Sequence, residues 1–536
     1  MVGAFFVALL AFVLYIPGFG NGFVYDAEVL VQHDARVHNL AHPVQLLTSK
    51  YWAFDEERLA LYRPVVTLSF AIDWVIHRGR AAGFHQTNAL AHALVSVLVF
   101  LLLTGLAATP AALAGAALFA AHPAHTEAVA TIVGRGDIFA AGFSFAALLA
   151  WRRLPPRGAA ALVTVPALFL LALGSKESAY MLPALLVLFD AAGGRLRRDR
   201  VRAWLHERAW LLLALALVAV AYTLVRLAVL GVFAPQSLNP VLVGDPSAAT
   251  RIRSALQVWP EILRLLTFPR VLLADYGPRI LLPAGSWTPR ALAGLALLAA
   301  ASGGGAVAFM RGRRRLGLAL LWTPVAMFTV SNLVIPIGVL LAERTLYIAV
   351  FAVSVGAAAA IDMLAARFKH GQRAALAGCV VITALFAART VSRLPAWHST
   401  DEVFRTLARD RPDSYRGQWH HARMATRDGD MTSAMSYYQA TIDLWPHAYP
   451  VYLEAGMIAA EEGQHVAARS FAEQALDEFP DDAVFLRRLA VASLILNDTA
   501  AARDALQRGL KVEPDDPLFL RMRDAIGAPD LYREPR

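Results

Sequence analysis

The 536-residue sequence has one cysteine and few charged residues, and both shortages narrow the class of protein. Cys379 stands alone, which excludes an intrachain disulfide framework and a cysteine-based metal cluster. Charged residues make up 17% of the chain and apolar residues 57%, and the mean hydropathy is +0.49. A soluble globular chain would carry more charge, so this composition predicts a polytopic membrane protein.

Long uncharged runs recur as far as Val391 and then stop. About 20 apolar residues span the hydrocarbon core of a bilayer, so we predict a membrane region at 1–393 and a separate domain at 394–536. The first run lacks a basic leader and a clear cleavage site, and we expect a retained helix. The segment 252–268 contains Pro260, and we expect a re-entrant or surface helix there. The eleven predicted membrane helices are 3–18, 86–105, 107–121, 138–151, 159–174, 179–191, 208–230, 290–309, 316–334, 345–361 and 374–391.

Arginine clusters lie in the short loops between these predicted helices. The loops after the fourth, sixth, eighth and tenth helices begin their clusters at Arg152, Arg195, Arg311 and Arg367. All four loops fall on one side, which the positive-inside rule assigns to the cytoplasm. We therefore predict a multi-pass protein of the cell inner membrane, with a cytoplasmic N-terminus and a periplasmic C-terminal domain. The net charge of +9 then reflects membrane topology and gives no sign of nucleic-acid binding.

The C-terminal domain has an internal repeat of 34 residues. Small residues, and a proline that closes each unit, recur at that spacing. This pattern is typical of tetratricopeptide repeats, in which paired helices pack through small side chains. We predict three helix pairs between about 413 and 516. The residues in register are Ala422, Gly456 and Ala490; Ala434, Ala468 and Ala502; and Pro446, Pro480 and Pro514.

The first acidic residues of the chain, Asp26 and Glu28, follow directly after the first apolar run. An acid at the edge of a membrane is costly unless it faces a cavity or a partner, which favours a functional role. A solvated loop with a helix-capping Asp explains the same pattern without function.

Charged and polar residues return to this outer side in four later loops. His122, His125 and Glu127 lie within six residues, but a proline separates the two histidines and no further ligand is obvious. Hydrogen bonding or substrate contact is favoured there over a metal site. In the same loop, Arg135 and Asp137 could contact substrate or pair with each other.

The remaining loops combine acids with cations. Lys176 and Glu177 interrupt an apolar stretch and could bind a phosphate or form a surface ion pair. Glu343 and Arg344 lie between two apolar runs, where Arg344 could contact phosphate oxygens. Structural pairing of Glu343 with Arg344 or with another loop is the alternative. Asp275 and Tyr276 follow the interrupted segment.

Taken in order, these motifs resemble a known family across nearly the whole chain. The sequence is similar to the transmembrane and tetratricopeptide-repeat-containing O-mannosyltransferases and their bacterial relatives, within the GT-C glycosyltransferases. Ala27 stands where the family usually has a second Asp, and Gly136 and Ile348-Ala349 also depart from the usual pattern. The matching motifs are Phe23-Val24-Tyr25-Asp26, Tyr62-Arg63-Pro64, Phe84-His85 with Asn88 and His92, His122-Pro123-Ala124-His125-Thr126-Glu127-Ala128-Val129, Val133-Gly134-Arg135-Gly136-Asp137, Lys176-Glu177, Asp275-Tyr276 and Ala342-Glu343-Arg344-Thr345-Leu346-Tyr347.

The resemblance implies an all-α, GT-C-type membrane bundle followed by a tetratricopeptide solenoid. It implies transfer of a sugar, with mannose the leading candidate, from a polyprenyl phosphate to a hydroxyl acceptor, with inversion. Asp26, or Glu28 in its place, would be the base, and Arg344, Lys176 and Arg63 would bind the donor phosphate. The substrate-orienting residues would be His85, Asn88, His122, His125, Glu127, Arg135, Asp137, Glu177, Asp275, Tyr276 and Glu343.

The implied mechanism requires no cofactor; a divalent metal is possible but not indicated. The partners would be the lipid-linked sugar, membrane lipids, and an acceptor protein or peptide held by the repeats. A non-catalytic membrane scaffold built around the repeats is the main alternative. A transporter of lipid-linked sugar is a third, but the membrane region shows no clear internal repeat.

Overall fold

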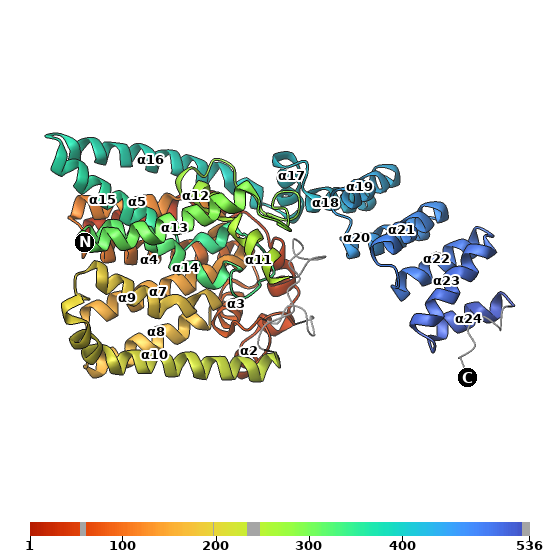
Figure 1. The fold of residues 1–536 in the computed structure, drawn as a ribbon, viewed down its shortest axis with the longest axis horizontal. Coiled ribbons are helices and arrows are strands. Elements are labelled where there is room, and N and C mark those ends of the chain that lie inside the picture. The colour runs from red at the N-terminus through yellow and green to blue at the C-terminus, as the bar shows by residue number, and fades with distance from the viewer. Residues whose placement is uncertain (54–60, 197, 233–246, 528–536) are drawn as a thin grey trace. The chain divides into compact units, whose positions relative to one another are not determined.

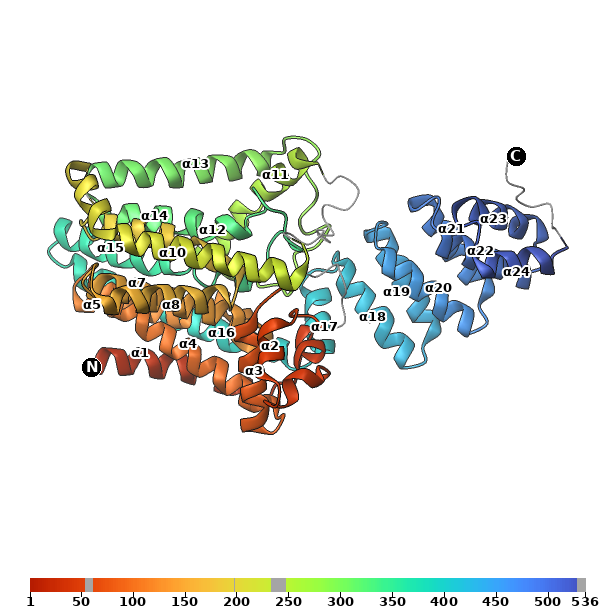
Figure 2. The same cartoon turned by 90° about the horizontal axis from the view of Figure 1, so that it is seen from below.

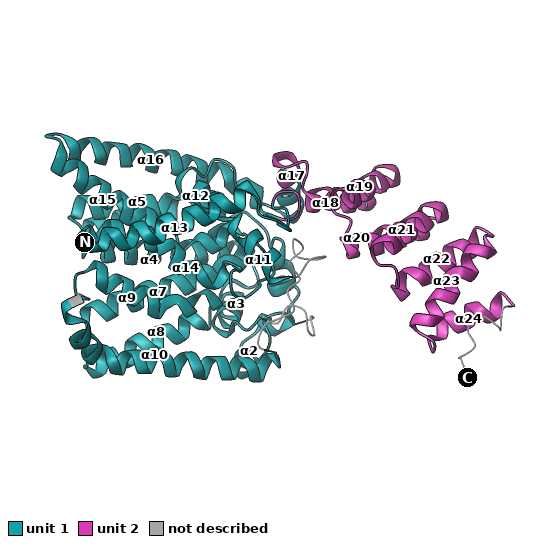
Figure 3. Ribbon diagram, viewed as in Figure 1, with its two compact units in different colours: residues 1–276, 281–406 teal, residues 277–280, 407–536 magenta. Residues whose placement is uncertain are grey.

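The computed structural model describes residues 1–53, 61–196, 198–232 and 247–527, and every regular element in these ranges is a helix. The chain forms two compact units, of residues 1–276 with 281–406 and of residues 277–280 with 407–536 (Figure 3). The predicted domain boundary at 393/394 stays a prediction. The all-α class is confirmed, with a membrane-type unit and a repeat unit.

Five helical segments of the first unit are long and apolar enough to cross a membrane. They are Ala81–Leu103, Ile132–Arg153, Val201–Leu230, Pro289–Met310 and Gly371–Trp397. At 1.5 Å per residue, segments of this length cover the hydrocarbon thickness of a bilayer. The chain is therefore a multi-pass membrane protein.

Each of the eleven predicted membrane segments contains a helix, but several of these are short. The count of eleven spans stays a prediction. The helices are α1 (Val2–Val13), α4 (Ala81–Leu103), α5 (Thr109–Ala121), α7 (Arg135–Arg153), α8 (Ala159–Leu173), α9 (Leu182–Ala192), α10 (Val201–Leu230), α13 (Pro289–Met310), α14 (Arg314–Ala326), α15 (Phe351–Arg367) and α16 (Gly371–Arg393).

The burial of these helices distinguishes central from peripheral positions. α4 and α7 are mostly buried, whereas α10, α13 and α16 expose most of their apolar side chains. Figure 1 shows α10 and α16 along opposite edges of the first unit, with α4 and α7 between them. Exposed leucines and valines on the outer helices suit contact with lipid.

Short helices gather at the end of the first unit opposite the N-terminus. In Figures 1 and 2, α2 (Pro43–Thr48), α3 (Pro64–His77) and α11 (Ala248–Leu256) all lie at that end. The interrupted segment 252–268 forms the end of α11 and then α12 (Trp259–Thr267), and each of these helices has nine residues. Neither is long enough to span a membrane, as expected for a re-entrant or surface segment.

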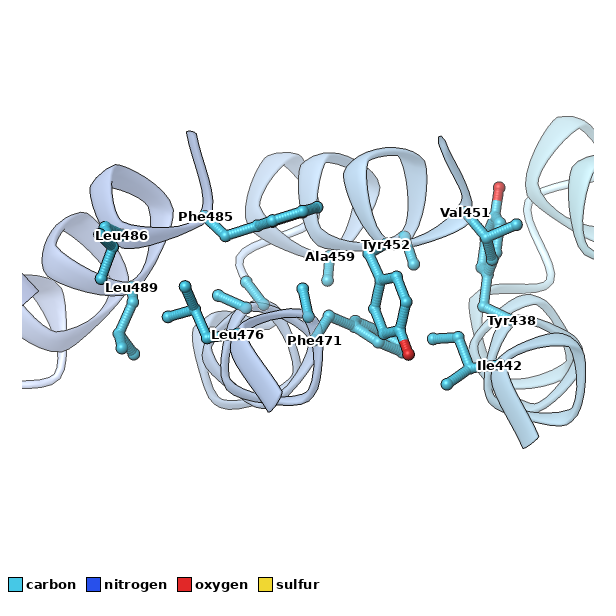
Figure 4. Close-up of a cluster of buried hydrophobic side chains, with 14 of the residues drawn as sticks. Tyr438, Ile442, Val451, Tyr452, Ala459, Phe471, Leu476, Phe485, Leu486 and Leu489 are labelled. Atoms are coloured by element: carbon cyan, nitrogen blue, oxygen red, sulfur yellow. The ribbon is translucent and has the colours of Figure 1, made fainter. Parts of the chain in front are cut away.

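The second unit contains the three predicted helix pairs. The two helices of each pair pack through the small residues in 34-residue register, and Ala422, Ala434, Ala490 and Ala502 are fully buried. Figure 4 shows the core that runs between the pairs, with Tyr452, Phe471 and Phe485 among its buried rings. The helices are α18 (Tyr415–Arg427), α19 (Met431–Leu444), α20 (Tyr449–Glu461), α21 (His465–Glu478), α22 (Ala483–Ile495), α23 (Thr499–Val512) and α24 (Pro517–Ala525).

Candidate functional site

Three ion pairs link the charged loops of the first unit, and each pair joins two different loops. Arg344 donates its backbone N–H to Glu127 Oε2 at 2.8 Å, and its guanidinium donates to the other carboxylate oxygen. The Nζ of Lys176 donates to Asp137 Oδ2 at 2.5 Å. Arg63 donates to Glu177 Oε2 at 2.9 Å. The predicted phosphate-binding cations are thus all present as ion pairs, and each is matched by one acid.

Local structure places these side chains at helix ends. Arg63 precedes α3, Lys176 precedes the 3₁₀ helix Glu177–Met181, and Arg344 lies in the 3₁₀ helix Glu343–Leu346. Glu127 lies in the first turn of α6 (Thr126–Ala130). Helix ends leave backbone groups without intrahelical partners, so they favour polar contacts between loops.

The charges of these pairs act on one another, which places them in one neighbourhood. Burial lowers the pKa of Arg344, but the charges of Glu127, Asp26 and Asp137 raise it more, so that the pKa is raised overall. Burial lowers the pKa of Lys176, which also feels the positive charges of Arg63 and Arg344. Asp26 is therefore within electrostatic reach of the cation cluster.

Asp26 and Glu28 have different surroundings within their loop. Both side chains are partly exposed, and Glu28 begins the π-helical turn Glu28–Gln32. The carboxylate of Glu28 accepts a hydrogen bond from the hydroxyl of Thr400. Asp26 acts electrostatically on Arg344 and on Tyr51, whose ring lies 5.3 Å from the Arg63 guanidinium carbon. The charge of Asp26 thus acts on the cation cluster.

Arg135 is fully buried and pairs with Asp73, not with Asp137. Its guanidinium donates to Asp73 Oδ2 at 2.5 Å, to Asn88 Oδ1 at 2.8 Å and to the carbonyl of Phe84. The Asn88 amide in turn donates to the carbonyl of Thr131 at 2.9 Å. This network joins α3, α4 and α7 and leaves Arg135 and Asn88 no surface for a substrate. Both side chains therefore help to hold these three helices together.

The three candidate histidines bond to backbone carbonyls. His85 contacts the carbonyl of Gly22 at 3.2 Å, His122 that of Leu266 at 3.1 Å and His125 that of Tyr347 at 3.3 Å. Burial lowers the pKa of His122 to about 4 and that of His125 well below its ordinary value, so both rings are neutral at physiological pH. Within the described residues, no three His, Cys, Asp or Glu side chains come together as a metal site.

Glu343 is buried and turns away from its neighbour Arg344. Its Oε1 accepts from the hydroxyl of Tyr276 at 2.8 Å and from the N–H of Leu273 at 2.6 Å. Burial raises the pKa of Glu343 to about 8. Glu343 and Tyr276 thus tie the 3₁₀ helix Glu343–Leu346 to the segment after α12, where Asp275 is partly exposed.

A small cavity of about 10 Å³, room for roughly one water molecule, lies next to the Lys176–Asp137 pair. It is lined by Asp137, Ser144, Ser178, Ile348 and three alanines. Apart from Asp137 and the two serines, the lining is apolar.

Comparison with known proteins agrees with both units. A family model described as Tetratricopeptide repeat matches residues 459–526. The protein O-mannosyl-transferase Tmtc2 of Drosophila melanogaster is 35% identical over 292 residues, covering 51% of this chain and 30% of the relative. The protein O-mannosyl-transferase TMTC4 of Homo sapiens is 27% identical over 501 residues, covering 81% of this chain and 65% of the relative.

The chain is thus similar in sequence to the TMTC protein O-mannosyl-transferases. The chain spans less than two thirds of the length of either relative. Among solved structures, an Archaeoglobus fulgidus oligosaccharyltransferase aligns at 14% identity with a TM-score of 0.29, over 99% of this chain and 57% of that chain. A likeness this weak does not identify the fold.

Several residues around the candidate site were not predicted from the sequence. Asp73, the partner of Arg135, is the single acid of α3, and a lone acid on an apolar helix was a usable signal. Tyr51, beside Arg63, carried no such signal. Thr400, the partner of Glu28, lies 372 residues away in the chain, and nothing in the local sequence pointed to it.

Proposed function

We propose that this chain is a GT-C-type membrane glycosyltransferase. It moves a sugar, with mannose the leading candidate, from a polyprenyl phosphate to the hydroxyl of a protein Ser or Thr. The observation that carries the proposal is the convergence of three cations from separate loops, Arg63, Lys176 and Arg344, near one partly exposed acid, Asp26. The homology to protein O-mannosyl-transferases supports the same reaction class.

Each group then has a defined part in an inverting displacement. The carboxylate of Asp26 takes the proton of the acceptor hydroxyl as its oxygen bonds to the anomeric carbon. The bond between that carbon and the phosphate oxygen breaks, and its electron pair leaves with the polyprenyl phosphate. Arg344 and Lys176 stabilise the charge that grows on the phosphate, and Arg63 is the third cation. No cofactor takes part in these steps.

When the donor phosphate binds, each cation must either leave its carboxylate partner or bind the carboxylate and the phosphate together. A phosphate accepts hydrogen bonds from Arg344 and Lys176 while Glu127 and Asp137 keep those side chains in place. Of the other candidates, Glu127, Asp137 and Glu177 orient the cations, whereas Asp275 is a candidate for contact with substrate. The lipid chain of the donor would lie in the outer leaflet, beside the apolar part of the bundle.

The arginine-rich loops support a cytoplasmic N-terminus and an active site on the outer face of the cell inner membrane. The repeats are then periplasmic and hold the acceptor protein in their concave surface. The test of topology is a set of reporter fusions after Arg198, Arg313 and Arg393. A cytoplasmic signal at Arg393 would contradict this orientation.

The test of activity is the transfer of radiolabelled sugar from a polyprenyl-phosphate donor by the purified protein. Asp26→Asn keeps the shape of the side chain but cannot take a proton, and transfer should fall roughly 10²–10⁴-fold. Glu28→Gln is the matched control from the same loop, and we expect a smaller effect. Wild-type transfer by Asp26→Asn would remove Asp26 from the mechanism. A protein without transfer under any donor would favour the scaffold alternative.

A further inference from the structure

The loop that carries Asp26 is fastened to the segment that follows the last helix of the membrane-type unit. The amide side chain of Asn21 donates to the carbonyl of Leu394 at 3.3 Å, and the N–H of Gly22 donates to the carbonyl of His398 at 3.1 Å. These contacts join residues that are more than 370 positions apart. The loop between α1 and α2 is thus held by a partner at the other end of the unit's sequence.

Thr400 makes the most specific of these contacts. Its Oγ1 accepts a hydrogen bond from the N–H of Tyr25 at 2.9 Å and donates its hydrogen to the carboxylate of Glu28. A hydroxyl has one donor and can accept at the same time, so one oxygen satisfies both groups. Tyr25 directly precedes Asp26, and Glu28 follows two residues later. Thr400 therefore bonds the backbone just before Asp26 and the side chain of Glu28 just after it.

The backbone of Tyr25 needs such an anchor. Its φ of +58° lies in the left-handed region, which bulky residues rarely adopt. A conformation of this kind persists only where the surroundings hold it, and it occurs often at functional sites. The Tyr25 ring also packs edge-on against Phe404, with ring centroids 5.6 Å apart. Both partners, Thr400 and Phe404, belong to α17 (Thr400–Asp410).

We infer that Thr400 is a positioning residue for Asp26, through its two hydrogen bonds to Tyr25 and Glu28. This inference rests on the proposed function, in which Asp26 is the base. A base must be held close to the proton that it takes, and a displacement of about 1 Å can lower turnover roughly 10²-fold. In this role Thr400 acts on turnover through the position of the loop.

The test compares two substitutions in the full-length protein. Thr400→Val removes the hydroxyl and keeps the branched shape, whereas Thr400→Ser keeps the hydroxyl. We expect Thr400→Val to lower kcat roughly 10–100-fold with little change in the KM for the polyprenyl-phosphate donor. Thr400→Ser should retain most of the wild-type kcat. Thr400→Ala removes the same hydroxyl and serves if the Val variant does not fold.

Thr406 of the same helix provides a matched control. Its hydroxyl also contacts a glutamate, Glu402, at 3.3 Å, and its side chain is buried. Thr406→Val therefore makes the same chemical change on α17 without touching the Asp26 loop, and we expect a wild-type kcat. Equal kcat in Thr400→Val and Thr406→Val, or a Thr400→Ser variant as slow as Thr400→Val, would overturn the inference.

Asp26→Asn, assayed in parallel, separates this inference from the proposed function. If Asp26→Asn is inactive and Thr400→Val is fully active, the base assignment stands and the positioning role of Thr400 is wrong. If Asp26→Asn transfers sugar normally, the proposed base itself is wrong, and the positioning role fails with it. If Asp26→Asn and Thr400→Val both have a low kcat and Thr400→Ser does not, the base assignment of Asp26 and the positioning role of Thr400 are both supported.

Discussion

Arg344 binds the carboxylate of Glu127 twice, through its backbone N–H and its guanidinium, although the two residues are 217 positions apart. Glu127 is only 2% exposed, whereas Arg344 is 26% exposed. The buried acid thus holds a cation that still reaches solvent. In the proposed reaction, this asymmetry suits a group that is held in place and also contacts the donor phosphate.

Arg344→Gln should weaken both the fold and the reaction. The substitution leaves the buried Glu127 carboxylate without a positive partner, at an expected cost of about 1–3 kcal/mol in unfolding free energy. Loss of the cation should also lower kcat by roughly 10²–10³-fold, the usual effect of removing one group that stabilises developing charge. Thermal unfolding in detergent and the transfer assay measure the two effects.

Arg264 is the matched control for Arg344→Gln. It has a similar exposure of 30% and also pairs with a glutamate, Glu261, but the side chain of Glu261 is 16% exposed. Arg264→Gln should change stability by less than about 1 kcal/mol, as for other surface pairs. An equal loss of unfolding free energy in Arg344→Gln and Arg264→Gln would mean that the burial of Glu127 does not affect the stability of the pair.

Glu343 should make stability depend on pH. Burial raises its pKa from an ordinary value near 4.5 to about 8, although the charge of Arg393 acts in the opposite direction. The folded protein therefore prefers the protonated acid. This contribution is fully present below pH 4.5 and is lost as pH rises toward 8, because the unfolded chain can then release a proton that the folded chain retains.

Glu343→Gln should remove that dependence. The amide oxygen of Gln can accept the same hydrogen bonds from Tyr276 and Leu273, but it carries no charge at any pH. The difference in unfolding free energy between variant and wild type should therefore grow in favour of the variant from pH 5 to pH 8. Thermal unfolding across this range measures it, and parallel pH curves for the two proteins would contradict the prediction.

Arg135 should be needed for folding more than for chemistry. Arg135→Met leaves Asp73 buried without its cation, at an expected cost of about 3–5 kcal/mol. Arg405→Met is the control, because the side chain of Arg405 is 55% exposed and pairs with Glu402 at the surface. We expect detergent-solubilised Arg135→Met to melt well below the control. A melting temperature equal to that of Arg405→Met would show that the buried network adds nothing.

Substitution by alanine should have opposite effects on stability at two glycines of the repeats. A Cβ at Gly509 would lie 2.4 Å from the buried ring of Phe519, so Gly509→Ala should destabilise the unit by about 1–3 kcal/mol. A Cβ at Gly456 would meet Phe471 at 3.9 Å, an ordinary contact, so Gly456→Ala should stabilise α20 by about 0.5–1 kcal/mol. Hydrogen exchange of the repeats in the full chain measures both, and changes of the same sign would contradict this packing.

The sequence predicted the repeats well because their signal is local and recurs. A period of 34 residues fixes which small residues meet, and the helix pairs follow it. The positions of the membrane helices were also predictable, since apolar runs mark them. The number of spans was less predictable. α5 has 13 residues and α8 has 15, fewer than the roughly 20 that cross a bilayer, so an apolar run alone does not decide whether such a helix spans the membrane.

The pairing of charges was not predictable from neighbours in the chain. Glu343 and Arg344 are consecutive, as are Lys176 and Glu177, yet each of these four residues pairs with a different segment. Consecutive residues in a helical turn point in different directions, so they do not face each other. Their true partners depend on how distant loops pack, and that information is spread over the whole unit.

The contact between Tyr25 and Thr400 also has a consequence for biosynthesis. The two residues are 375 positions apart, and ribosomes add about 5–20 residues per second, so the Asp26 loop is made roughly 20–75 s before its anchor. During that interval the early helices can enter the membrane while the loop lacks its partner. A nascent chain of this protein therefore acquires its complete site only after nearly the whole membrane-type unit has been translated.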